Sequence, residues 1–255
     1  MEFQGKVALV TGATRGIGRA AAVRLAKEGL QVAVNYRATG DPSETLRLIE
    51  EVGGRGFAVE ADMRQPEQIL RMVDEVARIG GSFDYLVSNA AINPFMSWDE
   101  ITLEDYDRIQ EINLRGTWVV CQAACKQMIK EGHGGAIVTV SSISAWVGAW
   151  NQVVYCGTKA GIWMLSKALA SVVGENGIRV NCVLPGSIDT DMSRGMSDNP
   201  EVKRYYEERT PLRRIADPAE VAAAIAFLLS DDASYCSSSE LLVDGGFIAN
   251  AEYVK

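Results

Sequence analysis

Thr11-Gly12-Ala13-Thr14-Arg15-Gly16-Ile17-Gly18 follows directly on the apolar run Val7-Ala8-Leu9-Val10, and this stretch decides the fold. Glycines in a strand-to-helix turn let the backbone approach a pyrophosphate, whose charge is met by the N-terminus of the following helix. No Lys-Ser or Lys-Thr pair follows the second glycine, so the stretch is not a mononucleotide-type phosphate loop. The sequence therefore predicts a dinucleotide-binding turn after the first strand.

Beyond this turn the chain alternates short apolar runs with longer amphipathic stretches. Runs that are apolar throughout are typical of strands covered on both faces of a parallel sheet. We expect one domain over residues 1–255: an α/β, Rossmann-type, doubly wound parallel sheet of about seven strands with helices on both faces. The predicted strands are Val7 to Val10, Val32 to Val34, Phe57 to Val59, Tyr85 to Val87, Ala136 to Val140, Val180 to Leu184 and Leu241 to Val243.

A long polar segment separates the last two predicted strands. Residues 187–212 carry two prolines and show one short helical pattern, from Glu201 to Glu208. A weakly structured insertion at the carboxyl edge of a sheet is more often an active-site lid than filler, so we predict a substrate lid at about 187–212. The next helix is well marked, with Asp217 as its N-cap, Pro218 at its first position and Glu220 three residues after the cap.

Composition and charge narrow the class of protein. A chain of 255 residues with 47% hydrophobic residues can bury a sizeable core. The net charge of −8 argues against a nucleic-acid surface, and no dense Lys/Arg cluster offsets it. The chain has no run of about 18 apolar residues and no signal-like N-terminal segment. We therefore expect a cytoplasmic protein with a small-molecule substrate and with no nucleic-acid or membrane partner.

The cysteines and the single histidine offer little for metal chemistry. Five cysteines without a CxxC pair are typical of reduced thiols rather than of a disulfide framework. Cys121 and Cys125 fit small buried thiols better than a metal or redox pair. His133 is the only histidine, so a multi-histidine metal site or a His-based triad lacks material. We expect no metal.

The residues after the second predicted strand bear on the choice of dinucleotide. NAD-binding folds typically have a carboxylate there to hold the ribose 2′-hydroxyl, whereas arginine accommodates a 2′-phosphate. This chain has Asn35-Tyr36-Arg37, and Arg15 lies inside the glycine turn. Two guanidinium groups can clamp a phosphate through paired hydrogen bonds. We expect NADP(H) to be preferred and NAD(H) to be possible; the alternative interpretation is that both arginines are simply solvated.

Tyr155-Cys156-Gly157-Thr158-Lys159 supplies a candidate acid/base pair. If the stretch is helical, Tyr155 and Lys159 lie on one face, because they are four residues apart. A nearby ammonium favours the phenolate, so we expect the pKa of Tyr155 to fall and the phenol to exchange a proton near neutral pH. The same spacing occurs by chance in many helices, so its meaning depends on the surrounding residues.

Those surroundings resemble the short-chain dehydrogenase/reductase family over essentially the whole chain. Ser142 lies thirteen residues before Tyr155, as the family pattern requires. The matching elements are Thr11 to Gly18, Asp62, Ser88-Asn89-Ala90-Ala91, Asn113, Ser142, Tyr155 with Lys159, Pro185-Gly186 with Thr190, and Val243-Asp244-Gly245-Gly246. The resemblance implies hydride transfer between a CH–OH group and an NAD(P) cofactor, and it also implies a homotetramer.

The resemblance further implies roles for single residues. Tyr155 would be the general acid/base, and Ser142 would hydrogen-bond the substrate oxygen. Lys159 would hold the nicotinamide ribose and lower the pKa of Tyr155, and Asn113 would anchor a water that relays protons. Cofactor contacts would come from Gly12, Thr14, Arg15, Gly16, Ile17, Gly18, Tyr36, Arg37, Asp62, Met63, Asn89, Ala90, Tyr155, Lys159, Pro185, Gly186, Ile188 and Thr190.

Two positions depart from the family pattern. Ala91 stands where glycine is usual, which adds one methyl group. Ser237-Ser238-Ser239 stands where a Thr-Gly pair commonly precedes the last strand. Neither departure touches the candidate catalytic residues, and the second would affect a loop or a subunit interface.

The segment from Ile143 to Val154 joins the candidate catalytic serine to the tyrosine helix and is predicted to line the substrate pocket. Its hydroxyls, amides and aromatic faces suit a small polyhydroxy ligand better than a long acyl chain, although the tryptophans have packing or a subunit contact as an alternative role. The predicted substrate-binding residues are Ser142, Ser144, Gln152, Tyr155, Asn93 and Trp146. Ser141 to Ala145 with Gln152, together with Asn35-Tyr36-Arg37, resemble bacterial sugar 1-dehydrogenases of the L-rhamnose and glucose types.

Other functions stay open alongside a sugar 1-dehydrogenase. A 3-oxoacyl-carrier-protein reductase or a general ketone reductase would share the catalytic residues. An acidic carrier protein needs a basic docking patch, however, and a net charge of −8 would steer it poorly. A regulatory protein that binds NADP without turnover is a third candidate, but it would need no acid/base tyrosine. We favour the sugar 1-dehydrogenase.

Overall fold

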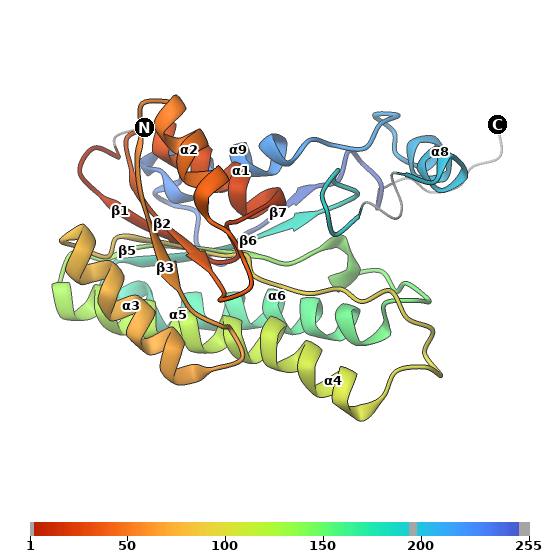
Figure 1. Cartoon of the computed structure of the whole chain (residues 1–255), viewed down its shortest axis with the longest axis horizontal. Coiled ribbons are helices and arrows are strands. Elements are labelled where there is room, and N and C mark those ends of the chain that lie inside the picture. The colour runs from red at the N-terminus through yellow and green to blue at the C-terminus, as the bar shows by residue number, and fades with distance from the viewer. Residues whose placement is uncertain (1–2, 194–197, 250–255) are drawn as a thin grey trace.

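The centre of the molecule is a parallel sheet between two layers of helices (Figure 1), as seen in a computed structural model that describes residues 3–193 and 198–249. Seven strands in the described part of the chain pair in the order β3-β2-β1-β4-β5-β6-β7, all parallel. The predicted doubly wound sheet is confirmed. The strands are β1 (Val7–Val10), β2 (Gln31–Tyr36), β3 (Arg55–Glu60), β4 (Tyr85–Ser88), β5 (Gly135–Val140), β6 (Ile178–Pro185) and β7 (Glu240–Val243).

Alternate residues of each central strand enter opposite cores, which is why the strands are apolar throughout. In β1, Ala8 and Val10 pack in the core beneath α1 and α9, whereas Val7 and Leu9 pack in the core beneath α3 and α5. Figure 1 shows α1, α2 and α9 on one face and α3 to α6 on the other. The helices are α1 (Gly16–Lys27), α2 (Ser43–Glu51), α3 (Pro66–Gly80), α4 (Leu103–Gln110), α5 (Gly116–Glu131), α6 (Val153–Val173), α8 (Pro200–Arg209) and α9 (Pro218–Leu229).

Helix α6 carries the predicted acid/base pair on its buried face. Its buried residues recur at helical spacing and include Tyr155, Thr158, Lys159, Ile162 and Ser166. Since a helix buries one stripe, the spacing of four places both Tyr155 and Lys159 on the side that faces the sheet. The helix therefore presents a phenol and an amine to the same interior region.

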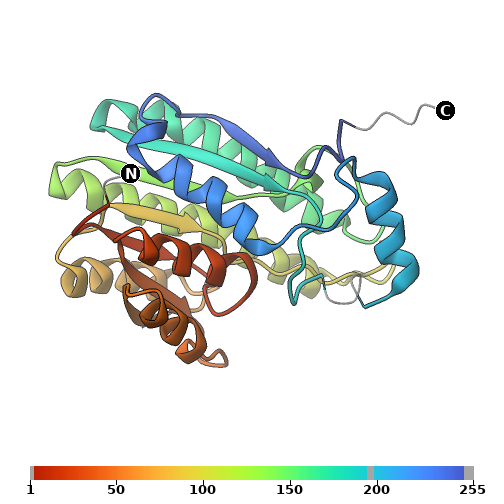
Figure 2. The ribbon, with the colours of Figure 1, turned by 90° about the horizontal axis from the view of Figure 1, so that it is seen from above.

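The segment of the predicted lid contains one helix in its described part. Helix α8 has the position predicted from Glu201 to Glu208, and Figure 2 shows it beyond the carboxyl ends of the strands. The start of the segment is tied to the rest of the fold by a bridge between Ile188 and Ala216. Residues 194–197 of the predicted lid lie outside the described residues. The predicted start of α9 is confirmed, because Asp217 and Glu220 form a reciprocal capping box.

The serine run before β7 contains an unusual backbone conformation. Ser238 has a φ of 61°, which lies in the left-handed region that favours glycine. Its N–H donates to the Val180 carbonyl at 2.8 Å, so the turn joins β6 to the beginning of β7. The departure from a Thr-Gly pair therefore places a side chain where the backbone would accept glycine more easily. None of the helices within residues 3–193 and 198–249 is long and apolar enough to cross a membrane.

Candidate active site

The site lies where neighbouring strands send the chain to opposite faces of the sheet. Strands β1 and β4 are adjacent, but β1 leads to α1 on one face and the chain after β4 leads to α4 on the other. Open α/β sheets bind ligands outside the carboxyl ends of the strands at such a switch point. The glycine turn after β1 and Asn89 after β4 meet there.

The glycine turn has a shape that only glycine permits. Gly12 and Gly16 have φ values of 63° and 55°. A Cβ atom on Gly18 would lie 2.4 Å from the Gly12 carbonyl oxygen, and one on Gly12 would lie 2.9 Å from the Ala90 Cα. The N-cap residue Arg15 makes no side-chain cap, so the N-terminus of α1 keeps its capacity to bind an anion. The turn thus fits a dinucleotide pyrophosphate.

Asn35 locks this turn to the sheet, a role that the sequence analysis missed. Its Oδ1 accepts from the Gly12 N–H at 3.1 Å. Its Nδ2 donates to the carbonyls of Tyr36, Val59 and Ala61 at 3.2 to 3.4 Å. The side chain is buried, so all four bonds are sheltered from water. The sequence signal for this role is a polar side chain within an otherwise apolar strand.

Thr11 and Asn89 complete the framework on the other side. The Thr11 hydroxyl accepts from the N–H groups of Asn89 and Ala90 at 2.9 and 3.1 Å. The Asn89 amide donates back to the Thr11 and Gly12 carbonyls at 2.9 and 3.2 Å. The turns after β1 and β4 are thus held together by reciprocal hydrogen bonds, and the predicted cofactor residues Gly12, Asn89 and Ala90 form one unit.

The residues predicted to meet the adenosine half lie farther along the same edge. Arg15 and Arg37 are exposed, and neither forms an ion pair within the part of the chain that the structure describes. The loop after β2 reaches the glycine turn, since a Cβ on Gly40 would lie 3.7 Å from the Thr14 side chain. Arg15, in the glycine turn, and Arg37, in the loop after β2, therefore lie on neighbouring loops.

Asp62 and Met63 follow β3 on this edge. Burial raises the pKa of Asp62, but hydrogen bonds from Arg64 outweigh it and hold that pKa below its usual range. The Asp62 carboxylate is therefore charged at neutral pH. Met63 is buried in the core with α3 and α5, so its side chain serves packing.

Tyr155, Lys159 and Ser142 come together at the end of β5. Tyr155 and Lys159 are buried, with 8% and 2% of their surface exposed, and the Lys159 Nζ lies 5.4 Å from the centre of the Tyr155 ring. The Lys159 Nζ donates to the Val140 carbonyl at 2.7 Å. Ser142 hydrogen-bonds the Tyr155 side chain and accepts from the Ser144 N–H at 3.0 Å. A phenol, an amine and a hydroxyl thus share one interior region.

The expectation that Lys159 lowers the pKa of Tyr155 is wrong for this structure. Burial raises the pKa of Tyr155 above its ordinary value, and the hydrogen bond from Ser142 only partly offsets this. Burial also lowers the pKa of Lys159 to about 8. The physical reason is that desolvation disfavours both charged forms and is the largest influence on the pKa of Tyr155, although a lysine with a pKa of about 8 still carries most of its charge at neutral pH.

Asn113 is fully buried in a π-helical turn, Glu111–Arg115, between α4 and α5. Its amide exchanges two hydrogen bonds with the backbone of Ile92, each 2.9 Å long, and donates to the Thr158 hydroxyl at 3.2 Å. π-Helical turns occur frequently at functional sites. The side chain joins the loop after β4 to α6, one residue from Lys159.

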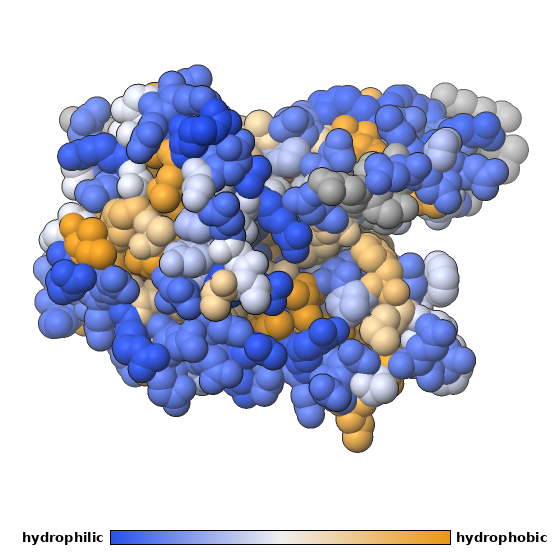
Figure 3. All heavy atoms as spheres, in the orientation of Figure 1, coloured by the Kyte–Doolittle hydropathy of each residue, from blue (hydrophilic) through white to orange (hydrophobic). Residues whose placement is uncertain are grey.

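A cavity opens beside Tyr155, and Figure 3 shows the molecule hollowed on this side, beneath the lobe that carries α8. Five of the six predicted substrate-binding residues line it: Ser142, Ser144, Gln152, Tyr155 and Asn93. Trp146 lies outside the lining and packs edge to face on Trp163 of α6, with ring centres 6.1 Å apart. Ile17, Asn89, Lys159, Pro185, Gly186, Ile188 and Thr190 of the predicted cofactor set line the cavity as well.

The cavity also has lining residues that the sequence analysis missed. Met192, Ser193 and Tyr206 come from the segment after β6 and from α8. The Ser193 hydroxyl accepts from the Thr190 N–H at 2.9 Å and lies 2.5 Å from the Ile188 carbonyl, so it shapes this turn. No pattern near Tyr155 in sequence could have identified Tyr206, because only the fold brings α8 across the cavity.

A dinucleotide turn next to a buried tyrosine, a buried lysine and a half-buried serine defines the class: an NAD(P)-dependent oxidoreductase that acts on CH–OH groups. The chain belongs to the short-chain dehydrogenase/reductase family, since a family model described as enoyl-(acyl carrier protein) reductase matches residues 12–248.

Relatives of this chain support the same class. An L-rhamnose 1-dehydrogenase (NAD(P)(+)) from Sphingomonas sp. is 42% identical and covers 98% of this chain and 99% of the relative. A 3-oxoacyl-[acyl-carrier-protein] reductase from Staphylococcus epidermidis is 37% identical over 94% of this chain and 98% of its own length. A solved short-chain type dehydrogenase/reductase from Mycobacterium marinum aligns with a TM-score of 0.93 and 34% identity, covering 98% of both chains.

Proposed function

We propose that this protein is a sugar 1-dehydrogenase that oxidises the hemiacetal carbon of an aldose, with L-rhamnose as the first candidate. The observation that carries the proposal is the polar lining of the cavity, where two hydroxyls and two amides surround Tyr155. That lining consists of Ser142, Ser144, Asn93 and Gln152. Small polar groups at fixed positions suit a ring that bears hydroxyls. The relative from Sphingomonas, named as acting on L-rhamnose, supports the choice.

The residues of the site would have separate roles in binding the cofactor, orienting the substrate and transferring the proton. The bound cofactor would supply the hydride acceptor, and the glycine turn, Asn89 and Lys159 would hold it. Ser142 would hydrogen-bond the reacting oxygen and keep it next to the phenol. Tyr155 would take the hydroxyl proton as the hydride leaves the same carbon. The base in this step is the phenolate of Tyr155, which burial makes scarce at neutral pH because it raises the pKa of the phenol. The positive charge of a bound oxidised cofactor would add to that of Lys159 and favour the phenolate, which would link proton transfer to cofactor binding.

We propose NADP(H) as the preferred cofactor and NAD(H) as an alternative. Arg15 and Arg37 lie on adjoining loops, are exposed, and lack an ion pair among the described residues, so both guanidinium groups are available to a 2′-phosphate. The stretch Asn35-Tyr36-Arg37 contains no carboxylate that could bind a 2′-hydroxyl, and the Asn35 amide is fully used by the backbone.

Two other functions would use the same residues. The relative from Staphylococcus epidermidis is named as a 3-oxoacyl-[acyl-carrier-protein] reductase, which makes a 3-oxoacyl thioester the second candidate substrate. We expect an acyl carrier protein to be acidic. The net charge of −8 disfavours that partner. A regulatory protein that only binds NADP would gain nothing from a buried acid/base tyrosine, so we rank it below both enzymes.

A substrate panel tests the proposal. Purified protein is mixed with NADP+ and L-rhamnose, D-glucose or other aldoses, and separately with NADPH and a simple ketone or a 3-oxoacyl thioester, while absorbance of the reduced cofactor is followed. We expect the highest kcat/KM for an aldose. Activity on the thioester alone would overturn the sugar assignment in favour of the reductase.

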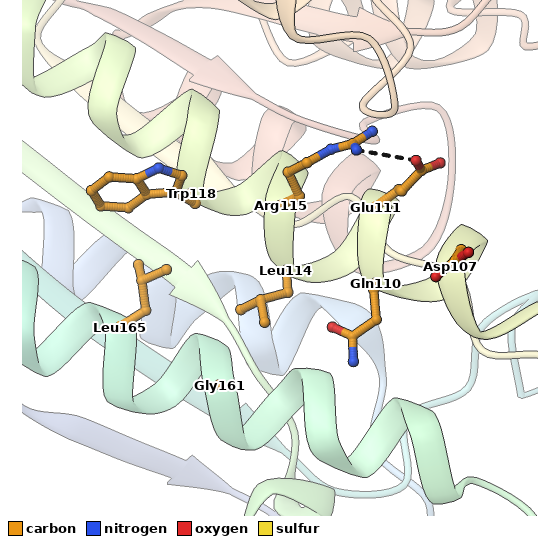
Figure 4. A pocket seen from close by; sticks show the side chains of 8 residues that line it. All are labelled: Asp107, Gln110, Glu111, Leu114, Arg115, Trp118, Gly161 and Leu165. Carbon is orange, nitrogen blue, oxygen red and sulfur yellow. Dashed lines mark ion pairs between the residues drawn. The ribbon is translucent and has the colours of Figure 1, made fainter. Parts of the chain in front are cut away.

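We also propose that the protein acts as a homotetramer in the cytoplasm, with residues 187–212 as the substrate lid. A groove between α5 and α6 is lined by Leu114, Trp118 and Leu165, and Trp118 is 42% exposed (Figure 4). A second copy of the chain would cover this apolar surface. The five cysteines are free thiols, which suits a reducing compartment. Light scattering should give a mass near four chains, and a monomeric mass at working concentration would contradict the assembly.

A further inference from the structure

Two amides join the loops that frame the cavity. The Asn93 Nδ2 donates to the Gln152 Oε1 at 3.2 Å. Nearby, the Met96 N–H donates to the Asn151 carbonyl at 3.1 Å, so the loop after β4 and the loop before α6 are connected twice. Asn93 and Gln152 both line the cavity next to Tyr155. The contact between the two amides is therefore part of the cavity wall.

Asn93 differs from the asparagines that support the fold. Both polar atoms of the Asn35 and Asn113 side chains are hydrogen-bonded. The Asn93 Oδ1, in contrast, is buried and has no hydrogen-bond partner among the described residues. An unpaired buried acceptor costs folding free energy. Asn93 therefore adds little to stability, and its single contact with Gln152 needs another explanation.

That contact decides how Gln152 presents its amide. The oxygen and nitrogen of a glutamine amide exchange places on a half-turn, so either could point into the cavity. The Asn93 donor occupies the Gln152 oxygen. The Gln152 N–H donors have no protein acceptor in the part of the chain that the structure describes. The wall next to Tyr155 consequently offers hydrogen-bond donors.

We propose that Asn93 is a positioning residue for substrate selection: it fixes the Gln152 amide so that its N–H groups meet an oxygen of the sugar. The ring oxygen and the hydroxyl lone pairs of an aldose are suitable acceptors, whereas an alkyl chain has none at that place. The inference rests on the proposed function, because it names how that site holds its sugar. It assigns Asn93 an effect through Gln152 rather than through the reacting atoms.

A double-mutant cycle tests the proposal. Asn93→Ala, Gln152→Ala and the double variant are compared in kcat and KM for L-rhamnose with NADP+. We expect Asn93→Ala to raise KM about tenfold with kcat within about twofold, the scale of one lost hydrogen bond. In the Gln152→Ala background, Asn93→Ala should have no further effect. Additive effects of the two changes would overturn the positioning role.

A second variant reverses the amide instead of releasing it. In Asn93→Asp the carboxylate can only accept, so it binds the Gln152 N–H and turns the Gln152 oxygen to the sugar. KM should rise more than in Asn93→Ala, while NADP+ affinity and melting temperature stay near wild type. Asn176→Asp, an exposed residue before β6, controls for the added charge.

The outcomes separate this inference from the proposed function. A wild-type enzyme that oxidises no aldose would overturn the sugar assignment and this inference together. A wild-type enzyme that oxidises L-rhamnose, combined with an unchanged KM in Asn93→Asp, would overturn the positioning role alone. Unfolding of Asn93→Ala would also contradict it, because the structure gives Asn93 too few contacts to support the fold.

Discussion

The dinucleotide side and the substrate side of the site differ in whether their polar side chains have hydrogen-bond partners within the protein. On the dinucleotide side, Thr11, Asn35 and Asn89 use their side chains to bind backbone atoms of the turns they shape. On the substrate side, Asn93 keeps a buried acceptor without a partner, and Gln152 keeps free donors. The first half is satisfied within the protein. The second half retains hydrogen-bond donors, those of Gln152, for a ligand.

This difference indicates where specificity resides. Fully bonded buried networks fix one geometry, which is what a common cofactor requires. A polar group without a protein partner contributes most binding free energy when the ligand supplies its hydrogen-bond partner. Such groups therefore distinguish one substrate from another. Cofactor binding should therefore tolerate changes on the substrate side, and the choice of substrate should depend on a few side chains there.

The largest expected effect comes from Tyr155→Phe. The substitution removes the proton donor and acceptor but leaves the dinucleotide turn unchanged, so kcat should fall by about 1000-fold. NADP+ affinity, measured by quenching of protein fluorescence, should change less than about threefold, because no bond of the glycine turn is lost. Unchanged turnover would show that Tyr155 is not the acid/base of the reaction and would favour the alternative of a regulatory protein that binds NADP.

An intermediate effect is expected from the exposed arginines. Arg15→Ala combined with Arg37→Ala should weaken NADP+ binding about 100-fold, since each guanidinium would give charge-assisted bonds to the 2′-phosphate. NAD+ binding should stay within about twofold, because it lacks that phosphate. Isothermal titration with both cofactors measures the two constants. Arg55→Ala, an exposed arginine at the start of β3, is a matched control. Equal losses for NADP+ and NAD+ would contradict the assignment.

The smallest effect concerns neither half of the site. Ser238 lies before β7, at the sheet edge opposite the cavity, and has a left-handed backbone. Ser238→Gly should raise the free energy of unfolding by about 1 kcal/mol by removing strain at the β-carbon. Urea unfolding measures the change, and kcat and KM should not move. A loss of stability would show that the Ser238 side chain, not its backbone, serves the turn.

Much of the fold followed from local patterns in the sequence. Apolar strands, the glycine turn and the capping box at Asp217 all depend on neighbouring residues, and the structure bears them out. The spacing of Tyr155 and Lys159 likewise placed both on one buried face of α6. Such features are readable because the chemistry lies within a few residues.

Features that depend on distant packing were not predictable in the same way. The spacing to Lys159 predicts a lowered pKa for Tyr155, but the degree of burial, which only the fold sets, reverses the direction. Tyr206 reaches the cavity from α8, and Trp146 packs on Trp163 instead of lining it. The amide contact of Asn93 with Gln152 joins residues 59 positions apart.

The contrast between the two halves is tested most directly by making one substitution in each. Asn35→Leu and Asn93→Leu remove the same amide, and both unfolding free energy and kcat/KM for L-rhamnose are measured. Asn35→Leu should lose about 3 kcal/mol of stability or more, because it leaves buried backbone groups unpaired. Asn93→Leu should change stability by less than about 0.5 kcal/mol yet lower kcat/KM about tenfold. Similar losses of stability in both variants would contradict the division between a satisfied cofactor half and a substrate half with free hydrogen-bonding groups.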